Sequence, residues 1–301
     1  MVISEPLVSI FCDTYNHELY IKQCLEGFIS QKTNFAFEVL VHDDASTDRT
    51  PEIIREYEKL YPHIIKPVYQ SVNHYSRGMK IWINYQFPRV KGKYIALCEG
   101  DDYWTDPYKL QKQVQFLEEN RDCSACYTNA IYLDENNKSS DVYLKGLKEG
   151  RVPINSLILR GGAIYPTASL VFRYTPYIFD GFKKIYELNG DNLLILLLAM
   201  QGCVYYFDQT SCVYRKWDGG VYSKTINDKS AAINRKVKTV IGLKKLLKIS
   251  KKPFKRYIIK RISGESLYVL LNDKSVERMA YLKNLNMKDL LRFLRKVILD
   301  S

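Results

Sequence analysis

The sequence lacks a hydrophobic run long enough to cross a membrane. Its longest apolar stretch, residues 193–200, has eight residues, whereas a spanning helix needs about 20. The N-terminal residues lead directly into a strand-like segment, without the basic region and apolar run of a secretory signal. We therefore expect a cytoplasmic protein in which residues 193–200 form a buried helix.

Cysteine and histidine are not arranged as in zinc sites or nucleophilic triads. The seven cysteines are scattered and odd in number. Five of them lie in apolar segments, where we expect buried free thiols: Cys12, Cys24, Cys98, Cys203 and Cys212. Cys123 and Cys126 have the C-x-x-C spacing, but no second pair completes a zinc site. The four histidines form no metal or triad constellation. Zinc binding, thioredoxin-like redox chemistry and Ser-His-Asp hydrolysis are therefore disfavoured.

Acidic residues are absent from one long segment. Residues 235–261 contain twelve Lys and Arg and no Asp or Glu, which equals the whole net charge of +12. Leucines alternate with lysines in this segment, which suits either a helical face packed on the rest of the chain or peripheral contact with an anionic membrane at its inner, cytoplasmic face. Both interpretations stay open. Nucleic acid is a less favoured partner because the segment looks amphipathic.

Three apolar, strand-like segments are each followed by a polar turn and the start of a helix. They cover residues 7–11, 37–41 and 94–97. Such a succession indicates an α/β fold with a mostly parallel central sheet flanked by helices. Ligands of such sheets bind beyond the carboxyl ends of the strands. We expect this sheet domain over residues 1–224 and a basic helical C-terminal region over residues 225–301.

The turn after the third strand is the most acidic of the three. Glu99, Asp101 and Asp102 lie within four residues, directly after the apolar segment 94–97. Carboxylates at this density repel one another unless a cation lies between them. A hard divalent cation with oxygen ligands, shared with substrate phosphates, is the economical partner. The segment therefore predicts a metal–phosphate site at the carboxyl end of a strand.

The ordered set of motifs resembles the inverting family-2 glycosyltransferases, which have the GT-A fold with a Rossmann-like nucleotide-binding half. The resemblance covers roughly residues 6–222, and its motifs are residues 8–10, 14–16, 43–48, 92–94 and 99–102. It implies transfer of a sugar from a nucleotide diphosphate sugar, expected to be UDP-linked. The acceptor would be a hydroxyl of a glycan or of a lipid-linked glycan.

The resemblance places the nucleotide base near the first two turns, at Thr14, Tyr15, Asn16, Asp43 and Asp44. A carboxylate there could accept the N3–H of uracil, backbone groups could pair with its carbonyls, and Tyr15 offers a ring for stacking. The same residue types also favour hydrogen-bonded turns and helix caps. Both roles are open at this point.

The resemblance also implies roles for the acidic turn and for two later positions. It carries the metal motif onto Asp101 and Asp102, so we expect Asp102 to bind Mn²⁺ or Mg²⁺ directly. Asp101 would contact the ribose or support the metal, and Glu99 is the third candidate ligand. It carries the general base onto Asp191, which opens the late apolar helix and could instead be a plain helix cap. Relatives often have Glu-Asp where this chain has Gly-Asp.

The resemblance is less complete at the motif of residues 214–220. Arg215, with Lys216, could neutralise a diphosphate leaving group, and two glycines permit a tight loop near a ligand. Relatives often carry histidine two residues after the arginine, and this chain has Trp217 there. The role of that histidine is therefore not transferred, and Trp217 could pack on a sugar instead.

Two other functions compete with glycosyl transfer. A nucleotidyltransferase also uses acidic metal ligands on an α/β fold, but it usually has a glycine-rich, basic loop near the N-terminus. Residues 12–16 contain neither glycine nor a basic residue. A non-catalytic sugar-nucleotide-binding scaffold tethered by the basic segment is the second alternative, and the retention of all acidic candidates argues against it.

Overall fold

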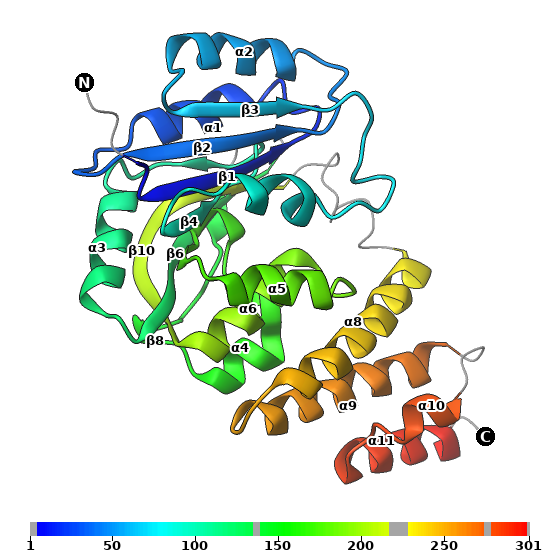
Figure 1. Cartoon of the computed structure of the whole chain (residues 1–301). Coiled ribbons are helices and arrows are strands. Elements are labelled where there is room, and N and C mark those ends of the chain that lie inside the picture. Colours follow the sequence, from blue (N-terminus) through cyan, green and yellow to red (C-terminus); the bar gives the residue numbers. More distant parts are fainter. Residues whose placement is uncertain (1–4, 135–138, 217–227, 274–277, 300–301) are drawn as a thin grey trace.

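The computed structural model describes residues 5–134, 139–216, 228–273 and 278–299, and the description below is confined to them. A twisted central sheet has helices on both faces (Figure 1). Its strands follow the order β3-β2-β1-β4-β9-β6-β10-β5, with β7 beside β6 and β8 beside β10. Their bounds are β1 Val8–Thr14, β2 Phe37–Asp43, β3 Ile65–Tyr69, β4 Tyr94–Leu97, β5 Tyr103–Trp104, β6 Cys123–Leu133, β7 Ser139–Val142, β8 Gly150–Arg151, β9 Val171–Arg173 and β10 Cys203–Arg215.

The N-terminal half has the expected parallel strand–helix arrangement. β1 pairs in parallel with both β2 and β4, and β2 pairs in parallel with β3. The crossovers are α1 (Ile21–Ile29) and α2 (Thr50–Leu60). Beyond β4 the sheet becomes mixed, because β9 runs antiparallel to both β4 and β6, whereas β6 and β10 are parallel. The α/β prediction is confirmed, and the purely parallel part ends at β4.

Both faces of the sheet are buried, and side chains alternate between them as strand geometry requires. Val8, Ile10 and Cys12 of β1 belong to the hydrophobic cluster with α1, α2 and α3 (Lys109–Glu119), and Phe11 belongs to the opposite cluster. That second cluster includes α4 (Ile154–Arg160), α5 (Pro176–Lys184) and α6 (Gly190–Gln201). Covered faces leave the carboxyl edge of the strands as the place for a ligand.

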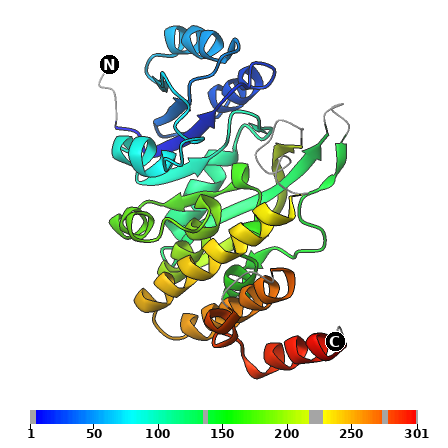
Figure 2. The ribbon, with the colours of Figure 1, turned by 90° about the vertical axis from the view of Figure 1, so that its right-hand side faces the viewer.

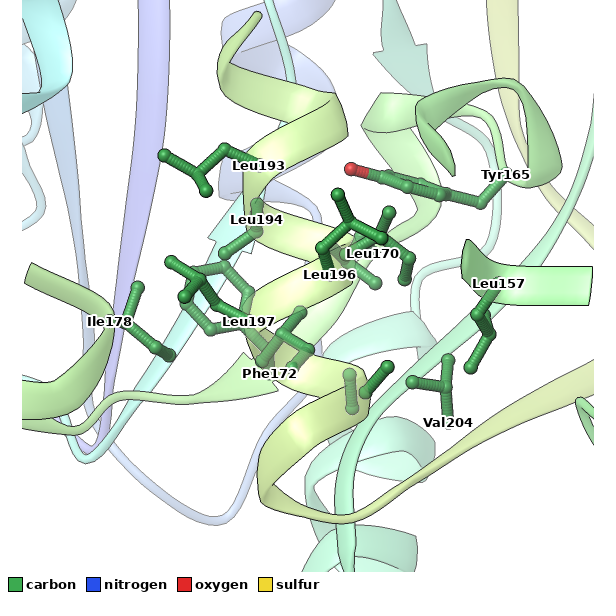
Figure 3. Packing of buried hydrophobic residues seen from close by; sticks show 14 of the residues in the cluster. Leu157, Tyr165, Leu170, Phe172, Ile178, Leu193, Leu194, Leu196, Leu197 and Val204 are labelled. Atoms are coloured by element: carbon green, nitrogen blue, oxygen red, sulfur yellow. The ribbon is translucent and has the colours of Figure 1, made fainter. Parts of the chain in front are cut away.

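The eight-residue apolar run lies inside α6, as expected. Every side chain from Leu193 to Ala199 is buried. Figure 3 shows why: α6 is packed on several sides by leucine, isoleucine and phenylalanine side chains from other elements. In the described part of the chain, no helix is long and apolar enough to cross a membrane.

The C-terminal region is helical, and its first two helices join the core. α8 (Lys229–Ile249) and α9 (Phe254–Asn272) pack side by side below α4–α6, with α10 (Arg278–Leu282) and α11 (Met287–Leu299) beyond them (Figures 1 and 2). Val240, Leu243 and Leu246 of α8 belong to the same buried cluster as α6. Leu243 and Leu246 therefore face the protein, as the packed interpretation expects, while Ile241, Ile249 and Ile259 of the same segment are exposed. Membrane contact by this segment stays a prediction.

Part of the positive charge of this segment is neutralised inside the molecule. Lys236 of α8 lies 2.7 Å from Glu265 of α9. Lys245 forms an ion pair with Glu187, which precedes α6. These pairs tie α8 to both of its neighbours and agree with the packed arrangement of its apolar side chains.

The expectation of a free thiol is wrong for Cys203 and confirmed for the other four cysteines of the apolar segments. Cys123 at the start of β6 and Cys203 at the start of β10 form a disulfide, with Cα atoms 4.2 Å apart. The two residues lie in register on neighbouring parallel strands. Their separation of 80 residues hides this pairing from sequence. Five other cysteines are free and buried: Cys12, Cys24, Cys98, Cys126 and Cys212.

Substitution of Leu243 by alanine should lower the free energy of unfolding by about 2–5 kcal/mol, because it leaves a cavity in the shared core. The matched control is Ile241→Ala on the same helix, where the side chain is 44% exposed and the expected change is about 0.5 kcal/mol or less. Chemical denaturation of both variants measures the difference. Equal effects would show that α8 does not share the core.

Candidate functional site

Three polar turns meet at the carboxyl edge of the sheet. The backbone carbonyl of Asp13 accepts the N–H of Gly100 at 2.9 Å, which ties the end of β1 to the acidic turn after β4. The carbonyl of Thr14 accepts the N–H of Asp44 at 3.0 Å, which ties the same end to the turn after β2. The three turns that carry the sequence-predicted residues therefore form one continuous edge.

The first two turns interlock through their own side chains. Asn16, in a left-handed conformation with φ of 55°, accepts the N–H of Thr47 on its Oδ1 at 2.8 Å. Its backbone N–H donates to Ser46 Oγ at 2.9 Å, and that hydroxyl donates to Asp43 Oδ1 at 2.5 Å. Asn16 and Asp43 thus hold the turn structure directly. The ring of Tyr15 remains 41% exposed at this edge.

Asp44 anchors the loop that follows β3. Its two carboxylate oxygens accept the backbone N–H groups of His74 and Tyr75, each at 2.8 Å. Its neighbour across the turn, Thr14, is buried and its hydroxyl lies 3.1 Å from His17 Nδ1. For these residues the structure supplies the hydrogen-bonded turn roles that the sequence left open.

The acidic turn is partly buried and electrostatically crowded. Burial, together with the negative charges of Asp101, Asp13 and Asp191, raises the pKa of Glu99 to about 8. Burial also raises the pKa of Asp102 well above its ordinary value, with Asp101 and Glu99 adding to the effect. One oxygen of Asp102 accepts the backbone N–H of Arg215 at 2.9 Å. The turn therefore gathers more negative charge than the nearby donors compensate.

Asp13 belongs to this cluster and was not assigned a role from sequence. Its carboxylate accepts Trp82 Nε1–H at 2.8 Å and Gln86 Nε2–H at 2.6 Å. Burial raises its pKa to about 6, against the lowering effect of these two hydrogen bonds. The sequence offered one hint of this role: Asp13 lies at the end of β1, directly before residues 14–16, which we expected near the nucleotide.

Arg215 is committed to the acidic turn itself. Its guanidinium lies between the rings of Tyr20 and Tyr103, 4.9 and 4.6 Å from their centroids. It donates to the backbone carbonyl of Asp101 at 2.6 Å and to Gln23. Arg215 is buried, and its contacts hold the acidic turn in place. These contacts favour a positioning role for Arg215 over the diphosphate contact expected from sequence. Trp217 and the two glycines after it lie outside the described residues.

Asp191 lies near the acidic turn in space, although it is far away in sequence. It is half-buried near the start of α6, where its backbone carbonyl accepts the hydroxyl of Tyr165 at 2.9 Å (Figure 3 shows this ring beside α6). Burial raises its pKa, and hydrogen bonds from the helix N-terminus and the charge of Arg261 lower it. Its charge in turn raises the pKa of Glu99 and of Tyr75. The structure thus brings the predicted base to the acidic turn.

Arg261 of α9 supports the start of α6, and nothing in the sequence pointed to it. Its Nη1 donates to the carbonyl of Ile158 at 2.8 Å, and its Nη2 donates to Asn192 Oδ1 at 3.0 Å. Asn192 directly follows the candidate base. A residue of the C-terminal region thereby fixes the helix turn that carries Asp191 and lowers the pKa of that carboxylate.

The donor set at the acidic turn fits a hard divalent cation that also binds substrate oxygens. Glu99, Asp101 and Asp102 supply carboxylate oxygens on one turn; Asp102 is buried, and the other two are half-buried. They do not form a closed three-ligand cage. The one such group within the described ranges is Asp122, Cys123 and Cys203, and the two sulfurs of that group are bonded to each other. An open site with few carboxylates is what Mg²⁺ or Mn²⁺ uses when substrate phosphates complete the coordination.

Comparisons with known proteins agree with this geometry. The model of glycosyl transferase family 2 matches residues 9–175. An uncharacterised protein of Mycobacterium tuberculosis is 34% identical over 228 residues, which is 74% of this chain and 62% of that protein. The putative teichuronic acid biosynthesis glycosyltransferase TuaG of Bacillus subtilis is 31% identical over 140 residues, 46% of this chain and 53% of that protein. The chain thus spans about three fifths of the mycobacterial relative.

Solved structures show the same fold at low sequence identity. The S. aureus TarS fragment 1–349 in complex with UDP-GlcNAc superimposes with a TM-score of 0.63 at 16% identity, covering 95% of this chain and 79% of that one. The mannosyltransferase PcManGT of Pyrobaculum calidifontis, in complex with GDP-Man and Mn²⁺, gives a TM-score of 0.55 at 16% identity, covering 93% and 79%. The predicted GT-A fold is confirmed, and with the family match covering more than half of its residues the chain belongs to glycosyl transferase family 2.

Proposed function

We propose that this protein is an inverting, metal-dependent glycosyltransferase that moves a sugar from a nucleotide diphosphate sugar to a hydroxyl of a glycan or lipid-linked glycan. One observation carries the proposal. Asp191, at the start of α6, lies close enough to the acidic turn for its charge to raise the pKa of Glu99, although the two segments are far apart in sequence. That arrangement supplies a base on one side and a cation site for a diphosphate on the other.

UDP is the proposed nucleotide, bound along the edge formed by the first two turns. The exposed ring of Tyr15 offers a stacking surface for the base, and the turn of Thr14, Asn16, Asp43 and Asp44 is held rigid by its internal hydrogen bonds. TarS was solved with UDP-GlcNAc and PcManGT with GDP-Man. Both nucleotides therefore belong in a test of donor choice.

Asp102 and Asp101, with Glu99 beside them, would hold Mn²⁺ or Mg²⁺. When bound, such an ion neutralises charge that develops on a departing diphosphate. The chain prepares this place by gathering three carboxylates on one turn, with Asp102 buried, and by bracing that turn with Arg215. Arg215 acts here as a positioning residue.

Asp191 would act as the general base. Inverting transfer needs one carboxylate on the acceptor side, which takes the proton of the attacking hydroxyl as that oxygen displaces the diphosphate in line. Burial strengthens Asp191 as a base by raising its pKa, and the charge of Arg261 counteracts this. A hydrolase would need a second, opposed carboxylic group around the scissile bond, which the transfer does not require.

A panel of UDP- and GDP-sugars tests the function itself. Release of UDP or GDP is measured with Mn²⁺, with Mg²⁺ and with a chelator, in the presence of glycan hydroxyl acceptors. We expect metal-dependent release from one UDP-sugar, and inversion at the anomeric carbon of the product. Binding of UDP without turnover of any donor would support a scaffold role instead.

Asp102→Asn should abolish turnover while the fold survives, because an amide oxygen is a weak ligand for a hard cation. Metal binding, measured by calorimetry in the presence of UDP, should also be lost in this variant. Asp122→Asn is the matched control, since Asp122 is an exposed acid paired with Arg151. Unchanged Mn²⁺ dependence in the Asp102 variant would contradict the metal assignment.

Asp191→Asn should lower turnover by roughly 10²–10⁴-fold, which is the usual contribution of a positioned base. Affinity for UDP and metal should stay nearly intact, because Asp191 lies on the acceptor side in this proposal. Comparison of kcat with the dissociation constant for UDP separates the two effects. A loss of UDP affinity with normal residual turnover would move Asp191 to the donor site.

Gly162→Ala should impair turnover through Asp191 without touching the donor side. A Cβ at Gly162 would lie 2.3 Å from Asp191 Oδ2 and 2.7 Å from its Cγ, so the carboxylate must move. Gly264→Ala is the control, because nothing lies within 4 Å of a Cβ there. Turnover and UDP affinity are measured for both. Normal turnover in the Gly162 variant would show that the position of Asp191 is not critical.

A further inference from the structure

The outer face of α11 carries an apolar stripe that the described residues leave exposed. Met287, Leu291 and Leu294 are spaced at i, i+4 and i+7, so they align on one side of the helix. Their side chains are 71%, 50% and 43% exposed. Exposed apolar residues in a row on one helix differ from the single exposed residues that any surface contains.

A basic stripe runs directly beside the apolar one. Lys288, Arg292 and Arg295 each follow a member of the apolar stripe by one residue and are exposed. Arg292 approaches Asp289 at 3.7 Å but keeps 60% of its side chain exposed. Residues 278–299 contain six Lys and Arg and one Asp. The two stripes together form the α11 surface.

The inner face of α11 is fixed to the rest of the protein. Ser263 of α9 donates to Asp289 Oδ2 at 2.6 Å and accepts the N–H of Asn286 at 2.8 Å. Phe293 is buried on the same side. α11 lies at the end of the molecule opposite α2 (Figure 1). The helix is therefore held in place with its amphipathic outer side turned away from the core.

We propose that the α11 surface docks on an anionic membrane. A helix with an apolar stripe flanked by Lys and Arg lies in a bilayer interface, with the apolar side chains among the acyl chains and the cations at anionic headgroups. Positive charge next to the apolar stripe selects this partner over a second copy of the chain, whose equal positive charge would repel it. This differs from contact through residues 235–261, where Leu243 and Leu246 are buried, and it does not depend on the proposed glycosyl transfer.

The test is co-sedimentation of the full chain with phosphatidylcholine vesicles that contain or lack phosphatidylglycerol. We expect binding to the anionic vesicles at low salt, weakened by added salt. Replacement of Lys288, Arg292 and Arg295 by glutamine should weaken it roughly 100-fold, since each basic residue near such a surface contributes about a fivefold factor. Replacement of Lys22, Arg49 and Lys59, exposed residues near the opposite end, removes the same charge and should have a much smaller effect.

A second measurement makes the apolar contact visible. Leu291→Trp places an indole in the exposed stripe, and its emission should shift to shorter wavelength on anionic vesicles only. No binding of the full chain to anionic vesicles, or equal losses in both charge variants, would overturn the proposal. A dimer in solution that Leu291→Gln converts to a monomer, with vesicle binding unchanged, would assign the surface to a second copy instead. Thermal unfolding of each variant confirms that it is folded.

Discussion

Crowding of carboxylates at one edge of the sheet is the constraint on which the site depends. The charges of Asp101, Asp13 and Asp191 raise the pKa of Glu99, and those of Asp101 and Glu99 raise the pKa of Asp102, in addition to the effect of burial. Trp82, Gln86 and the N–H of Arg215 supply hydrogen bonds, but they do not balance the charge. A structure that tolerates this cost at a sheet edge is typical of a site that binds a cation and its anionic substrate.

Close packing around the carboxylates explains two glycines at the site. A Cβ at Gly100 would lie 2.7 Å from Thr14 Oγ1 and 3.0 Å from His17 Nδ1, so the acidic turn could not approach β1 with any larger residue. Gly162 plays the same part for Asp191. At both positions, the missing side chain lets a loop come close enough to fix a carboxylate.

Whether a feature could be predicted from the sequence depends on how far apart along the chain its interacting residues lie. The strands and turns of the N-terminal half were predictable because hydrophobic periodicity and turn chemistry are local. The role of Asp191 could be predicted only from the resemblance of the chain to the glycosyltransferase family. The pairing of Cys123 with Cys203 and the reach of Arg261 to Asn192 depend on which elements become neighbours in space, and no local pattern encodes them. Arg215 was found by its motif, while its bracing role came from two tyrosine rings elsewhere in the chain.

The amino-acid composition changes near residue 225, but the helices after this point still pack into the same core as α6. α8 contributes Leu243 and Leu246 to the core under the sheet, and α9 contributes Arg261 to the support of α6. Removal of these helices would therefore expose apolar surface and release the helix turn that carries Asp191.

The basic residues of the C-terminal region fall into two groups. Lysines of α8 pair with Glu187 and Glu265 inside the fold, whereas the basic stripe of α11 lies on the outside. Other basic residues of segment 235–261, such as Lys238, Lys248 and Lys260, are exposed as well. What distinguishes the last helix is the exposed apolar stripe beside its basic residues, whereas the inner helices serve the catalytic half through their buried side chains.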